Sequence, residues 1–158
     1  MNCVDWGQAR TFAVWVGGDL PTEAQWEYAA RGGEDYLYAG SDNVDEVGWY
    51  SGNSRIRTQP VKTKRANGYG LYDMSGNVSE WALDEWHGNY QGAPSQAETP
   101  WGDVFPCSQM CDIGSSWRVK RGGGWSSNAG RLRVADRNYN VPEYRFIALG
   151  FRVRRTLP

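Results

Sequence analysis

The stretch Asn67-Gly-Tyr-Gly-Leu-Tyr-Asp-Met-Ser-Gly-Asn-Val-Ser-Glu-Trp81 combines three glycines, several aromatic side chains and two carboxylates, and it shows almost no helical periodicity. Glycine reaches backbone conformations that other residues avoid, and the run from Asp73 to Asn77 is typical of turns in which short polar side chains bond their own backbone. The stretch therefore predicts tight, irregular backbone instead of a helix.

The two carboxylates of this stretch, Asp73 and Glu80, are separated by a loop rich in backbone carbonyls. Hard cations such as Ca²⁺ bind oxygen-rich surroundings of this kind. The alternative interpretation is a rigid turn in which Glu80 pairs with an arginine. The spacing alone leaves both interpretations open.

Four blocks of the sequence, in this order, resemble the formylglycine-generating enzyme (sulfatase-modifying factor) family. They are residues 20–33, 70–81, 121–125 and 150–152. The resemblance covers nearly the whole chain and implies that family's variant of the C-type-lectin fold, an α+β fold with a small twisted antiparallel sheet, two helices and much irregular loop. Family domains usually begin upstream of the segment that matches Met1, so we expect one domain over 1–158 that is shortened or is the C-terminal part of the fold.

Length and composition agree with one domain. A chain of 158 residues can bury a core, and a mean hydropathy of -0.68 with 14% aromatic residues predicts a core built more from Trp and Tyr than from aliphatic side chains. The formal net charge of -1 gives no reason to expect nucleic acid or an anionic membrane as a partner. No apolar run is long enough for membrane insertion. The compartment and the oligomeric state stay open.

Two helices are predicted from apolar spacing and capping residues. One covers 6–16 with Asp5 as N-cap, and the other begins after Thr22 and ends at the glycines 32–33. Short alternating segments predict strands that pair antiparallel. These segments are 60–62, 118–121, 131–135 and 149–154. Residues 34–58 and 83–116 are expected to be loop.

The arginines concentrate between residues 118 and 155, and we expect them to hold loop carbonyls and carboxylates.

The cysteine pair Cys107 and Cys111 fits either a local disulfide or two free thiols. His87 is the single histidine, so a zinc site of Cys and His is not expected. We predict that His87 lies exposed in a loop and has no catalytic role.

The family resemblance also bears on catalysis. The family enzymes hold copper(I) with two cysteines in the block that follows the Gly-Gly-aromatic motif, and Ser127 and Leu132 occupy those positions here. A hydroxyl and an isobutyl group do not bind a soft monovalent copper ion, so formylglycine generation is not expected. A second branch, similar to ergothioneine-type sulfoxide synthases, needs several histidines for iron. The alternative function is a family oxidoreductase, or a degenerate enzyme, that acts on protein or sulfur substrates.

One structural Ca²⁺ site is also implied by the resemblance. Its ligands would be the side chains of Asp73 and Glu80 and the backbone carbonyls of Gly76 and Val78. A second family site needs an asparagine close to Val47, and this departure argues against it.

The segment 126–148 mixes an arginine-rich frame with positions of varied chemistry. These positions are Ser126, Ser127, Gly130, Leu132, Asp136, Tyr139, Val141, Tyr144, Phe146, Ile147 and Ala148. Each of these residues is reached from an asparagine codon by changing adenines only, which is the pattern of a diversity-generating retroelement. The segment is similar to the variable region of retroelement-diversified proteins with this fold. We therefore expect a non-catalytic surface that binds a protein or glycan; the alternative is an ordinary core and loop segment.

Overall fold

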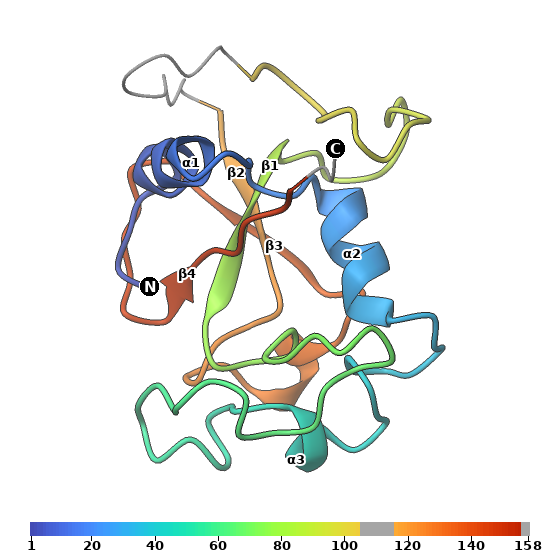
Figure 1. The fold of residues 1–158 in the computed structure, drawn as a ribbon, viewed down its shortest axis with the longest axis vertical. Coiled ribbons are helices and arrows are strands. Elements are labelled where there is room, and N and C mark those ends of the chain that lie inside the picture. The colour runs from blue at the N-terminus through green and yellow to red at the C-terminus, as the bar shows by residue number, and fades with distance from the viewer. Residues whose placement is uncertain (105–115, 156–158) are drawn as a thin grey trace.

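The computed structural model describes residues 1–104 and 116–155. Within these ranges the chain forms a four-stranded sheet of order β3-β2-β1-β4, with helices α1 and α2 on either side of it (Figure 1). The elements are α1 (Trp6–Trp15), α2 (Glu23–Arg31), α3 (Val44–Val47), β1 (Ser79–Glu85), β2 (Arg118–Arg121), the 3-10 helix η1 (Ala129–Leu132), β3 (Arg137–Asn140) and β4 (Leu149–Gly150). The predicted α+β fold is confirmed. None of the helices in the described ranges is long and apolar enough to cross a membrane.

Both long helices begin where their capping residues predict. The Asp5 carboxylate accepts a hydrogen bond from the backbone N–H of Gln8 at 2.7 Å, and Thr22 Oγ1 accepts one from Gln25 at 3.1 Å. In each case the glutamine side chain bonds back to the capping residue, which satisfies two free N–H groups at once. Gly32 ends α2 with a φ of 63°, a conformation that glycine adopts without strain.

The sheet differs from the prediction in three ways. Strand β2 pairs antiparallel with β1 and β3, but β4 pairs parallel with β1 and is only two residues long. Residues 60–62 form a turn, in which Lys62 has a φ of 62° and donates its N–H to Asp73, so that predicted strand is wrong. Strands β1 and β3 and the short helix α3 were not predicted.

The predicted strand at 131–135 is also wrong, although its burial does alternate. Leu132 and Val134 are buried between exposed residues. Leu132 belongs to η1, and the Val134 backbone N–H donates to the loop carbonyl of Leu37, at 3.0 Å, instead of to a strand. Alternating burial here comes from a 3-10 turn followed by extended chain, without a strand ladder.

The two faces of the sheet bury different chemistry. On one face, Trp81 packs with α1 residue Trp6 in an apolar cluster, as the tryptophan-rich composition predicts. Both indole N–H groups donate to backbone carbonyls, Trp6 to Ala82 at 2.8 Å and Trp81 to Val4 at 3.1 Å. On the other face, charged side chains of the sheet meet α2. The N-terminal segment lies beside β4 (Figure 1).

Of the cysteines, Cys3 is exposed and unbridged. Cys107 and Cys111 lie outside the described residues, so their pairing stays a prediction.

Candidate ligand-binding site

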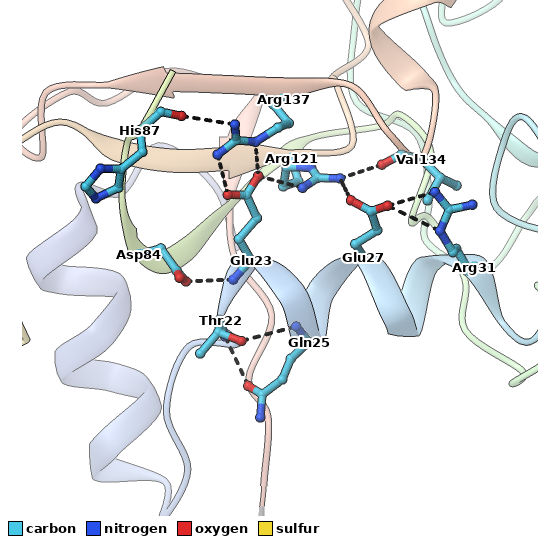
Figure 2. A network of polar contacts seen from close by, with 10 residues as sticks. All are labelled: Thr22, Glu23, Gln25, Glu27, Arg31, Asp84, His87, Arg121, Val134 and Arg137. Atoms are coloured by element: carbon cyan, nitrogen blue, oxygen red, sulfur yellow. Dashed lines mark hydrogen bonds and ion pairs between the residues drawn. The ribbon is translucent and has the colours of Figure 1, made fainter. Parts of the chain in front are cut away.

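A buried ion-pair network holds β2 and β3 against α2 (Figure 2). Arg121 lies between two carboxylates of α2, with distances of 2.6 Å to Glu23 and 2.7 Å to Glu27, and it also donates to the carbonyl of Val134 at 2.6 Å. Arg137 makes two further bonds to Glu23, of 2.7 and 2.8 Å. These arginines therefore have the structural role that the sequence predicts.

The network also sets the charge state of its members. Burial alone would raise the pKa of Glu27, but hydrogen bonds and charge from Arg121 and Arg31 outweigh it, and the pKa is lowered. Asp84 on β1 accepts the backbone N–H of Glu23 at 2.6 Å, and burial raises the pKa of this carboxyl. Paired buried charges of this kind fix geometry, because removing one partner leaves the other unsatisfied.

A pocket of about 130 Å³ lies beside the glycine turn that follows β2. Its wall includes the turn 122–124 and Lys120 and Asn138 from the paired strands β2 and β3. A Cβ atom on Gly124 would lie 2.9 Å from the carbonyl oxygen of Ala148, so glycine lets the chain before β4 approach the turn. Six of the eleven predicted variable positions line this pocket. They are Ser126, Ser127, Asp136, Tyr144, Phe146 and Ala148.

The other predicted positions lie in two different environments. Gly130, Tyr139, Val141 and Ile147 are exposed, and Ile147 is 53% exposed. Leu132 is the exception, because it is fully buried in a cluster with Tyr38 and Val47. Its side chain cannot reach a ligand in this structure.

The aromatic side chains of the predicted surface are only partly exposed to solvent. Tyr144 is half-buried and packs against the α1 side of the core, a contact that the sequence does not predict, whereas Phe146 is 39% exposed. Tyr139 stacks on Trp117 and packs at a tilted angle against Trp86, with both ring centroids 4.6 Å away. Neither tryptophan was predicted to lie near the variable surface, because β3, which carries Tyr139, was not recognised as a strand.

Of the charged side chains in the pocket, Asp136 and Arg131 pair with each other, whereas Lys120 forms no ion pair among the described residues. Asp136 lies 3.6 Å from Arg131, and its pKa is raised by burial against the opposing effect of the arginine charges. Burial, together with the charge of Arg131, lowers the pKa of Lys120. The Lys120 ammonium lies 5.5 Å from the centre of the Tyr144 ring.

The two side chains that are predicted to bind calcium, those of Asp73 and Glu80, have other partners. Arg152 holds both oxygens of Glu80, at 2.5 and 2.7 Å, and the indole of Trp26 donates to the same carboxylate at 2.7 Å. Asp73 accepts from the backbone N–H of Lys62 at 2.9 Å. Although burial lowers the pKa of Arg152, the charges of Glu80 and Asp73 raise it overall. Glu80 therefore does not fit a cation unless Arg152 leaves, and calcium binding stays a prediction.

His87 is half-buried, contrary to its predicted exposure. Its ring stacks on Trp101 at a centroid distance of 3.9 Å, and its carbonyl accepts a hydrogen bond from Arg137 at 3.0 Å. The residue thus supports the ion-pair network through its backbone.

The sheet, the glycine turn and the adjoining pocket define a C-type-lectin-like domain of the formylglycine-generating-enzyme type. The family described as sulfatase-modifying factor enzyme 1-like domain matches residues 1–157, and the chain belongs to this family. The formylglycine-generating enzyme of Streptomyces coelicolor is 37% identical over 167 residues, which cover 94% of this chain and 50% of that enzyme. The first curated relatives extend well beyond this chain, which spans 23% to 53% of their length.

Two solved structures support the same assignment. Variable protein 1 of Treponema denticola has a TM-score of 0.65 and 39% identity, over 85% of this chain and 46% of that one. PvdO from Pseudomonas aeruginosa has a TM-score of 0.80 and 30% identity, over 99% of this chain and 61% of that one. The fold thus carries both family enzymes and a variable protein.

Proposed function

We propose that this chain is a non-catalytic ligand-binding protein whose pocket and rim, within residues 126–148, are diversified by a retroelement. The observation that carries the proposal is spatial. Ten of the eleven predicted variable positions line the pocket or lie exposed, and Leu132 alone is buried away from it. The similarity to a variable protein of Treponema denticola supports the same function.

The ligand is a protein or a glycan. Exposed aromatic and apolar side chains on a rigid support bind such partners well, because they bury area at little cost in side-chain entropy. Phe146 and Ile147 meet this condition at the pocket rim. The Arg121 network supplies the rigid support from the other face of β2.

The test is to sequence codons 126–148 in many clones or individuals, together with the flanking DNA. We expect substitutions at adenine-derived codons, a nearby reverse transcriptase and a near-identical template repeat. Codons 79–85 and 118–121, which encode β1 and β2, are the internal control and should be uniform. Uniform codons across 126–148 with no such cassette would overturn the proposal.

The alternative is a family oxidoreductase, and the similarity to formylglycine-generating enzymes favours it. At the two positions that match the copper cysteines, Ser127 lines the pocket and Leu132 lies in the core. Neither side chain is a thiolate. Copper(I) titration separates the two functions, because stoichiometric tight binding would support the oxidoreductase.

A further inference from the structure

Lys120 occupies the middle of the sheet at the edge of the pocket. It pairs with Trp81 of β1 and Asn138 of β3. Successive side chains of a strand point to opposite faces, so Lys120 points away from the α2 face on which its neighbour Arg121 is buried. Lys120 and Asn138, opposite each other on one face, both line the pocket.

The cations around Lys120 all have acidic partners. Arg121 pairs with Glu23 and Glu27, and Arg131 lies 3.6 Å from Asp136. Within residues 1–104 and 116–155, no carboxylate forms an ion pair with Lys120, and its ammonium lies 5.5 Å from the centre of the Tyr144 ring. A cation that is partly removed from water and has no anion beside it favours binding of an anion.

The rest of the pocket suits a small acidic group. Asp136 is the only carboxylate among the residues that line it, and this group faces Arg131. The Ser126 hydroxyl and the Asn138 amide offer hydrogen bonds, and the Phe146 ring offers an apolar wall. Hydrogen bonds from an ammonium to a carboxylate are about twice as strong as neutral ones.

We infer that the pocket takes a carboxylate of the ligand, which pairs with the Lys120 ammonium. The inference rests on the proposed function, because it names the chemical group that the same site recognises. Lys120 lies outside the predicted variable positions, so this anchor would stay constant while the rim around it varies. A carboxylate of this kind occurs in acidic amino-acid side chains and in acidic sugars.

The test uses small probes in matched pairs, followed by NMR of the lysine side chains and the backbone amides. N-acetylglutamate is compared with N-acetylglutamine, and methyl glucuronide with methyl glucoside. We expect at least one acid to shift the Lys120 signals and those of residues 122–126, and its neutral partner to bind at least tenfold more weakly. Whichever acid binds more tightly identifies the source of the carboxylate. Equal binding of acid and neutral probes to the wild-type chain, or no binding of either acid, would overturn the inference without any need for variants.

Two variants place the effect on one side chain. Lys120→Met keeps an unbranched stem but removes the charge, and it should lower the affinity for the acid at least tenfold. Lys62→Met is the matched control, because the Lys62 ammonium also contacts a tyrosine ring, Tyr72 at 5.8 Å, but is exposed and lies outside the pocket. An affinity that is unchanged in Lys120→Met, or lowered equally in both variants, contradicts the inference.

The two proposals fail in different experiments. If codons 126–148 prove uniform but the acid binds at Lys120, the pocket is a fixed carboxylate site and the diversified surface is wrong. If the codons vary and neither acid binds, the diversified surface stands and the role of Lys120 is wrong.

Discussion

Lys120 and Arg121 are neighbours in β2, yet their charges lie on opposite faces of the sheet in different surroundings. Arg121 is fully buried, and its two terminal nitrogens bond to two glutamates and a carbonyl, whereas its Nε has no hydrogen-bond partner among the described residues. Lys120 is half-buried beside an open pocket and has no carboxylate partner among the described residues. On the α2 face the buried charges are thus paired with one another, whereas on the pocket face the Lys120 charge is left for another molecule.

The largest expected effect is on the α2 face. Arg121→Ala should lower the free energy of unfolding by about 3–5 kcal/mol, because it leaves two glutamates without their buried partner. Arg145→Ala is a matched control, since the Arg145–Asp5 distance is also 2.6 Å but Arg145 is exposed. Exposed pairs contribute about 0–1 kcal/mol. Urea unfolding of both variants measures the difference, and equal losses would contradict the division between the faces.

Leu132 tests where the proposed variable surface ends. Leu132→Ala should cost about 2–5 kcal/mol, because it opens a cavity in the cluster with Tyr38 and Val47. Ile147→Ala, at a side chain that is 53% exposed, should change stability by about 0.5 kcal/mol or less. Thermal and urea unfolding check both values. A loss below about 1 kcal/mol for Leu132→Ala would return this position to the surface.

The sequence predicts the parts of this fold that local rules determine. Capping residues such as Asp5 and Thr22 act on their own helix, so both helices were found at the right places. Strand β3 reads Arg-Asn-Tyr-Asn, so its hydropathy does not alternate and the sequence does not predict a strand. Its residue Arg137 is held in place by an ion pair with Glu23, which lies far away in the sequence. Only tertiary contacts make such a segment a strand.

The candidate site was predicted in the same uneven way. The codon pattern predicts eleven variable positions, and six of them line the pocket, but their variation stays a prediction. It could not show that Leu132 is buried, because codons carry no information on packing. Lys120 was missed for a related reason: its approach to Asn138 and Tyr144 depends on the unrecognised strand β3 and on the chain before β4.

The pH dependence of stability should differ in sign between the two faces. The lowered pKa of Glu27 means that its contribution is present above the ordinary value of 4.5 and is lost as the pH falls through the folded-state value. Burial raises the pKa of Asp136, so its ionised form destabilises the fold until protonation relieves it as the pH falls toward 3.8.

Urea unfolding of Glu27→Gln and Asp136→Asn between about pH 6 and pH 3.5 measures this difference, over a range that contains both ordinary carboxyl pKa values. The stability advantage of the wild type over Glu27→Gln should shrink on acidification. Relative to Asp136→Asn, the wild type should instead gain stability. If the stability of both variants changed with pH in parallel with that of the wild type, neither carboxyl would change its pKa on folding.

The smallest effect in the wild-type chain is expected from calcium. A cation that uses Glu80 must displace Arg152, so adding Ca²⁺ or EDTA should shift the melting temperature little while that pair is intact. Arg152→Ala removes the charge that competes with Ca²⁺ for Glu80. Because a ligand stabilises the state that binds it, Ca²⁺ should raise the melting temperature of this variant more than that of the wild type. A large calcium effect in the wild type, with calcium found by mass spectrometry, would show that Arg152 yields Glu80 to the ion. The α2 face would then depend on a bound metal at this point instead of on its own side chains alone.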